Sequence, residues 1–83
     1  MALKVELVSP TQQVWSGEAT FVSARTTEGD LGVLSGHAPL FGVLVDGAVS
    51  IKGADGTVTD FIVRGGFLSV SNDRVSILTE SVG

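Results

Sequence analysis

The feature that most constrains this sequence is a repeated alternation of apolar and polar residues. Leu3, Val5 and Leu7 alternate with Lys4 and Glu6. A period of two is typical of a β-strand with one buried face and one solvated face. The same alternation returns at 49–52, 68–71 and 75–78. No stretch of about ten residues repeats apolar side chains at helical spacing, so we expect an all-β domain without a long helix.

Turn-forming residues stand where these strands should end. Ser9-Pro10 closes the first strand, because proline cannot donate a ladder hydrogen bond, and Asp46-Gly47 indicates a hairpin. Gly65-Gly66 is interpreted as a bulge or sharp bend that lets one long strand change sheets. Many short antiparallel strands favour a β-sandwich or barrel. The predicted strands cover roughly 3–8, 12–15, 18–25, 31–34, 41–46, 48–53, 57–64, 67–71 and 74–80.

The inward-facing members of these strands predict the hydrophobic core. Phe41 is expected there, whereas Trp15 is left open between a core residue and an interface anchor. The predicted core residues are Val5, Leu7, Val14, Phe21, Leu31, Val33, Leu40, Val43, Val45, Val49, Ile51, Phe61, Val63, Leu68, Val70, Val75 and Ile77.

Composition excludes several classes of function. A length of 83 residues, with 43% hydrophobic and 17% charged, indicates one globular domain. The five basic residues are scattered and the net charge is −4, so neither nucleic-acid binding nor attraction to an acidic lipid surface is expected. No apolar run approaches the roughly 20 residues of a membrane span. With no cysteine and one histidine, we expect no metal site and no cofactor.

The segment 28–40, EGDLGVLSGHAPL, combines glycines, two carboxylates and the single histidine with apolar residues. This mixture predicts a loop ordered by packing that runs into a short strand and a tight turn, with its polar groups displayed to a partner. The glycines do not form a phosphate loop, because no lysine follows them before Lys52. A small hydrolase built on His37 and Asp30 is one alternative, but no nucleophile-elbow motif accompanies them. We therefore expect no catalytic residues.

Five segments together resemble the epsilon subunit of F-type ATP synthases. They are VSP at 8–10, VWSGEA at 14–19, the long motif at 28–40, GGFLSV at 65–70 and VSILTE at 75–80. These segments follow the family's order and spacing and span nearly all of the chain. The resemblance implies an antiparallel ten-stranded β-sandwich, a single domain over residues 1–83, and a non-catalytic rotor-stalk subunit. Such a subunit links the gamma subunit to the membrane c-ring of a proton-translocating ATP synthase.

The resemblance also implies two contact surfaces. The loop matching the family's ring-facing loop is Glu28, Gly29, Asp30 and Leu31, with His37 close by. Charge-complementary contacts of this kind set register and partner choice. By analogy, the gamma-facing side is expected near Ser9, Pro10, Gln12, Gln13, Leu40, Phe41, Gly42 and Val43.

Family members usually continue into a C-terminal helical hairpin, whereas this chain ends at Ser81-Val82-Gly83, where that hairpin would begin. The expectation is therefore the N-terminal sandwich domain, with the hairpin either removed or naturally absent. The lack of a signal-like leader favours the cytoplasmic face of a bacterial plasma membrane, as a peripheral part of the complex. The competing interpretation is a stand-alone carbohydrate-binding β-sandwich, supported by Trp15.

Overall fold

The computed structural model describes residues 2–82 and forms eight strands, with no helix in that range. The prediction of an all-β domain is confirmed. The strands are β1 (Leu3–Ser9), β2 (Gln12–Thr26), β3 (Gly29–Leu34), β4 (Leu40–Leu44), β5 (Gly47–Gly53), β6 (Val58–Val63), β7 (Gly66–Ser71) and β8 (Arg74–Leu78).

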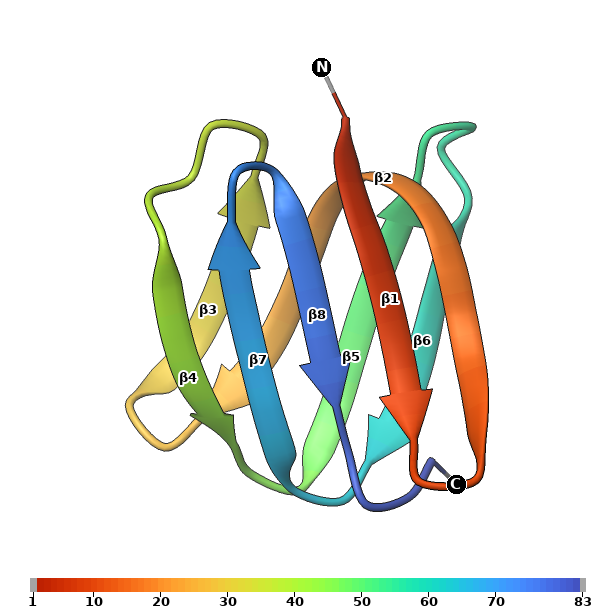
Figure 1. The fold of residues 1–83 in the computed structure, drawn as a ribbon, viewed down its shortest axis with the longest axis vertical. Coiled ribbons are helices and arrows are strands. Elements are labelled where there is room, and N and C mark those ends of the chain that lie inside the picture. The colour runs from red at the N-terminus through yellow and green to blue at the C-terminus, as the bar shows by residue number, and fades with distance from the viewer. Residues whose placement is uncertain (1, 83) are drawn as a thin grey trace.

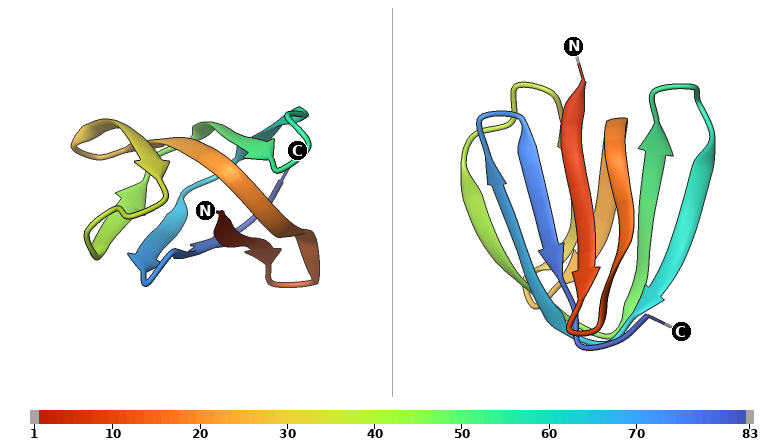
Figure 2. Two further views of the ribbon diagram at one scale, coloured as in Figure 1. Left: turned by 90° about the horizontal axis from the view of Figure 1, so that it is seen from above. Right: turned by 45° about the vertical axis from the view of Figure 1, so that its right-hand side comes forward.

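The strands form two layers that are joined by β2 (Figures 1 and 2). One layer has the order β1-β8-β7-β4, and the other is built from β3, β2, β5 and β6. The first half of β2 pairs with β1, and its second half pairs with β3 on one edge and β5 on the other. Because one strand of 15 residues serves both layers, the two sheets are continuous.

Two features of the predicted topology are wrong. The predicted strands 12–15 and 18–25 are one strand, because Gly17, at φ 159°, has an extended backbone that continues the ladder beneath the Trp15 ring. The merger reduces the nine strands predicted from alternation to eight within residues 2–82, and this count also differs from the ten strands that the resemblance implies. The sheet is also not wholly antiparallel, because β1 runs parallel to β8.

Gly65 lies between two strands and Gly66 is the first residue of the second, so the pair does not lie within one long strand. β6 ends at Val63 and β7 begins at Gly66, and the chain reverses direction while it passes between the layers (Figure 1). The bend was predicted correctly, but the single bent strand was not. Gly66 has φ 115°, and a Cβ there would overlap the carbonyl oxygen of Leu78. The close approach of the β8 backbone therefore requires glycine at this position.

The core between the layers is aliphatic and matches most of the alternating residues. Phe41 and Val43 are exceptions, because they are 67% and 44% exposed, and their predicted core positions are wrong. Residues 40–45 are apolar at both strand phases apart from Gly42, so alternation could not say which phase faces inward. In the structure Leu44 takes the buried position. The predicted core residues that are buried are Val5, Leu7, Val33, Val49, Ile51, Val63, Leu68, Val70, Val75 and Ile77.

Other predicted core residues are only half-buried: Val14, Phe21, Leu31, Leu40, Val45 and Phe61. In the second half of β2 the small residues face the core instead, and Ala19, Val22 and Ala24 are buried. The Phe21 ring lies outside them, over Gly32 of the paired strand β3. Trp15 is half-buried and packs against the core cluster, which favours its core interpretation over that of an exposed anchor.

Candidate partner-binding surfaces

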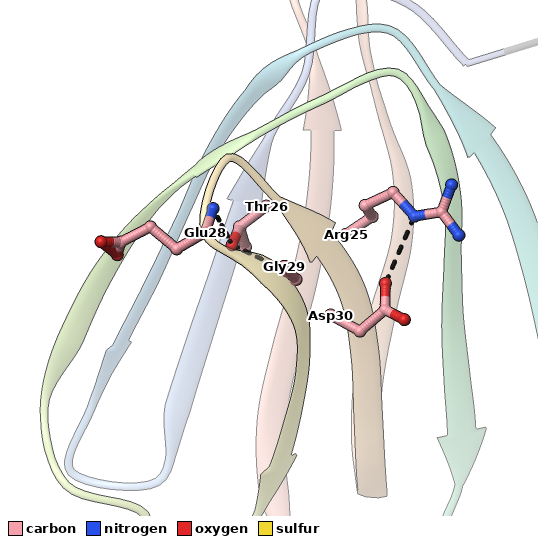
Figure 3. A network of polar contacts seen from close by, with 5 residues as sticks. All are labelled: Arg25, Thr26, Glu28, Gly29 and Asp30. Carbon is pink, nitrogen blue, oxygen red and sulfur yellow. Dashed lines mark hydrogen bonds and ion pairs between the residues drawn. The ribbon is translucent and has the colours of Figure 1, made fainter.

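The predicted ring-facing residues begin at the tip of the β2–β3 hairpin. Thr26 pairs with Gly29, which leaves Thr27 and Glu28 in the turn. The Thr26 hydroxyl donates to the Gly29 carbonyl oxygen at 2.9 Å and accepts from the Glu28 amide at 3.1 Å (Figure 3). The side chain of Glu28 points away from the hairpin in that view. The turn is therefore held by its own residues while its carboxylate remains exposed.

Asp30 lies within β3 and faces its cross-strand neighbour on β2. Its Oδ1 atom lies 3.2 Å from Nε of Arg25, and the two side chains are 81% and 63% exposed (Figure 3). The guanidinium offsets the Asp30 charge locally, so Glu28 is the uncompensated carboxylate of this hairpin. An exposed cross-strand pair of this kind contributes only about 0–1 kcal/mol to folding.

His37 does not lie close to this hairpin, and that part of the prediction is wrong. It follows the far end of β3, in the β3–β4 loop at the opposite end of the sandwich (Figure 1). A strand of six residues rises about 17 Å between its ends. The His37 amide donates to Leu34 O at 3.1 Å, and its Nδ1 lies 2.7 Å from Ala38 O. This separation from Asp30 also removes the geometry that a His37–Asp30 hydrolase would need.

A second surface is the outer face of β4, β7 and β8. Phe41, Val43, Phe67 and Leu78 are exposed there, and we call these four residues the apolar face. Val43 lies opposite Phe67, which in turn lies opposite Leu78. The rings of Phe41 and Phe67 stack with centroids 5.4 Å apart. The pairing of adjacent strands thus gathers apolar side chains that the core does not use.

A groove continues the apolar face toward the β1–β2 turn. It is lined by Val8, Ser9, Pro10, Val43, Gly66, Phe67, Leu78, Thr79 and Glu80. Of the residues expected on the gamma-facing side, Ser9, Pro10 and Val43 line this groove, and Phe41 stacks beside it.

The remaining residues expected on the gamma-facing side are placed differently. Leu40 and Gly42 are half-buried at the inward phase of β4, and the exposed Gln12 and Gln13 pair with β1 beyond the groove. Sequence reasoning missed Phe67 and Leu78. In both cases the signal was a neighbouring pair of apolar residues, Phe67-Leu68 and Ile77-Leu78, of which a strand can bury only one.

Other polar groups within residues 2–82 offer little chemistry. No group of three or more His, Asp or Glu residues in that range is arranged to hold a metal ion. The pKa of the Asp55 carboxyl is lowered because the Thr57 backbone amide donates to it at 2.9 Å. That contact closes the β5–β6 turn and is structural. Between Ala2 and Val82 there is no helix long and apolar enough to span a membrane.

The fold is that of a small β-sandwich domain that carries the apolar face on one layer and a hairpin with an exposed carboxylate at one end. The chain belongs to the family described as ATP synthase, Delta/Epsilon chain, beta-sandwich domain, whose model matches residues 2–82. An ATP synthase epsilon chain of Streptomyces avermitilis is 54% identical over 78 residues, which cover 94% of this chain and 63% of that relative. One from Frankia casuarinae is 51% identical over 81 residues, covering 98% of this chain and 95% of the relative.

Solved structures share the fold at lower sequence identity. A chain of the mitochondrial ATP synthase of Euglena gracilis superposes with a TM-score of 0.93 at 24% identity, over 99% of this chain and 52% of that chain. A chain from the central stalk and c-ring structure of the Tetrahymena thermophila enzyme gives 0.83 at 19% identity, over all of this chain and 66% of that chain. This chain spans 63% of the length of several bacterial relatives.

Proposed function

We propose that this chain is the β-sandwich domain of a non-catalytic rotor subunit that links the gamma subunit to the membrane c-ring of a proton-translocating F-type ATP synthase. Family membership and relatives named ATP synthase epsilon chain support this proposal. The observation that carries it is the apolar face. Exposed apolar clusters on small domains mark interaction sites, because water contact with several large apolar side chains is unfavourable.

The gamma subunit is proposed to cover the apolar face and the groove beside it. The expected contacts Ser9, Pro10, Phe41 and Val43 are retained, and Phe67 and Leu78 are added because they share the same surface. Burying one exposed phenylalanine contributes about 1.5–3 kcal/mol. Two stacked rings at the centre of a contact are the kind of group that dominates binding energy.

The c-ring is proposed to meet the β2–β3 hairpin through Glu28, Gly29, Asp30 and Leu31. The exposed Glu28 carboxylate would face basic groups of the ring. His37 is not retained as part of this contact, because it lies at the other end of β3. A contact through exposed charges sets orientation and partner choice more than affinity.

The proposed location follows from the bacterial relatives. Epsilon chains of Streptomyces and Frankia support a peripheral position on the cytoplasmic face of the plasma membrane, as part of the complex. The domain is proposed to have no catalytic site of its own, and no small-molecule cofactor is needed for a mechanical link. Its contribution would be a rigid body with one apolar and one acidic attachment surface.

Co-purification with the gamma subunit tests the proposal. Phe41→Ser should weaken binding at least about tenfold, because an anchor at the centre of the contact is truncated. Ile62→Ser is the matched control, since Ile62 is 56% exposed on the outer side of the other layer, against 67% for Phe41. Stoichiometric binding by wild type and the Ile62 variant, with loss in the Phe41 variant, supports the assignment. Failure of the wild-type chain to bind gamma would refute it.

A further inference from the structure

The loop between β3 and β4, residues 35–39, is left without a role by the proposed contacts. It crosses from one layer to the other and leads directly into β4, which begins at Leu40. Phe41 of the apolar face is the next residue. β4 pairs with β7 along its whole length, and at its far end it pairs with Thr26 of β2 and accepts the Thr27 amide at the Val43 carbonyl oxygen. The path of the 35–39 loop therefore determines how the other end of the strand enters the sheet.

One side chain from a distant part of the sequence holds this loop. The Asp73 carboxylate accepts a hydrogen bond from the Gly36 amide at 2.7 Å and another from the Ser35 hydroxyl at 3.2 Å. The Asp73 carbonyl oxygen also accepts the Lys4 amide of β1 at 2.8 Å. Bonds to an ionised acceptor are stronger than those between neutral groups. Asp73 therefore ties the loop to the β7–β8 turn and to the start of β1.

The backbone conformation at this position is easier for glycine than for aspartate. Asn72 and Asp73 have φ values of 51° and 59°, and within residues 2–82 they are the only non-glycine residues with positive φ. A two-residue hairpin of this kind most readily takes glycine at its second position. Glycine would serve the turn alone at least as well, whereas the two bonds from the loop require the carboxylate.

We propose that Asp73 is a positioning residue. By fixing the 35–39 loop, it makes β4 join the sheet beside β7 with Phe41 stacked on Phe67. The apolar face is then formed before a partner arrives, which lowers the ordering cost of binding. The inference rests on the proposed function only for the identity of that partner, the gamma subunit. We call the two bonds from the Asp73 carboxylate to Ser35 and Gly36 the clamp. The clamp is a property of this chain and is measurable without a partner.

Asp73→Gly is the decisive variant, because glycine keeps the turn and removes only the carboxylate. Amide hydrogen exchange at Gly36 should accelerate by at least about tenfold while Val70 and Val75 keep their protection. The affinity for purified gamma subunit, measured by calorimetry, should weaken by about three- to tenfold. Asn72→Gly is the matched control, because it changes the neighbouring turn residue and leaves the clamp intact, so both quantities should stay at wild-type values.

Asp73→Asn provides the rescue. Its amide oxygen still accepts from Gly36, and asparagine tolerates positive φ. Most of the protection and affinity should return. Unchanged exchange at Gly36 in Asp73→Gly would overturn the clamp, and faster exchange with unchanged gamma affinity would overturn the positioning role. If wild type itself fails to bind gamma, the proposed function falls. The loss or persistence of Phe41–Phe67 ring contacts by NMR in Asp73→Gly then decides the positioning role alone.

Discussion

The two ends of β3 are held by different kinds of contact. At the β2–β3 hairpin, Thr26 bonds residues two and three positions away, and Arg25 faces Asp30 five positions away. At the β3–β4 loop, the carboxylate that accepts from Ser35 and Gly36 belongs to Asp73, which lies 38 and 37 positions further along the chain. A local contact persists while its hairpin survives, whereas a distant one depends on the whole sandwich. The hairpin should therefore tolerate single changes better than the loop.

The largest effect is expected where a distant backbone approaches most closely. Gly66→Ala should lower the free energy of unfolding by about 3 kcal/mol or more, because the new Cβ would overlap the Leu78 carbonyl oxygen. Urea denaturation measures the change. Gly56→Ala is the control, since Gly56 also has a positive φ, at 88°, but has open space around it. Equal losses in both variants would mean that backbone conformation, not the distant contact, limits the fold.

Glycine replacement at each end of β3 sharpens the comparison. Gly29 and Gly36 have φ values of 115° and 86°, and a Cβ at either would meet nothing within 4 Å. Each alanine variant should cost about 1–2 kcal/mol from backbone strain alone. Hydrogen exchange distinguishes the two variants. Gly36→Ala should also speed amide exchange in the 35–39 loop, because it weakens the bond from the Gly36 amide to Asp73. Gly29→Ala should leave the amides of the 35–39 loop protected. Loop exposure in both variants would remove the distinction.

Thr26→Val tests the local hydrogen bonds that hold the β2–β3 turn. The change keeps the shape of the side chain and removes the hydroxyl that bonds Glu28 and Gly29. A loss of about 1 kcal/mol in unfolding free energy is expected. Amide exchange should rise at Glu28 and stay unchanged at Gly36. An effect that spreads to the far loop would show that the two ends are coupled.

The Arg25–Asp30 pair should contribute less. Arg25→Gln is expected to cost about 0.2–1 kcal/mol at low salt, because both side chains are largely exposed. The difference from wild type should fade at about 1 M salt, where the screening length is near 3 Å. A double-mutant cycle with Asp30→Asn isolates the pair. A coupling energy that is independent of salt would argue against this interpretation.

The smallest effect concerns Asp55 in the β5–β6 turn. Its pKa is lowered below the ordinary value of 3.8 by the Thr57 amide. A lowered carboxyl pKa gives stability that is present above the unfolded value and lost as pH falls through the folded one. Asp55→Asn should therefore flatten the acid limb of the stability curve below about pH 4. An acid limb identical to that of wild type would refute this contribution.

Several elements could be predicted from residues alone. Alternation located β1, β5, β7 and β8, because each has one wet and one buried face. Alternation failed in β4, where both faces are apolar, and it split β2 at Gly17, where the backbone stays extended. The sequence indicated Glu28 as an exposed carboxylate of the hairpin. It did not indicate Phe67 and Leu78, because their place in the apolar face depends on which strands pair.

The sequence by itself determined the class of fold, the places where the chain turns and the family, because period, turn residues and motifs are local properties. Only the tertiary structure decided that Phe41 faces outward, that His37 and Glu28 lie at opposite ends of β3, and that Asp73 holds a loop 37 residues before it. These outcomes depend on which strands pair and in which register. Pairing is set by burial of the whole core, so no single segment specifies it.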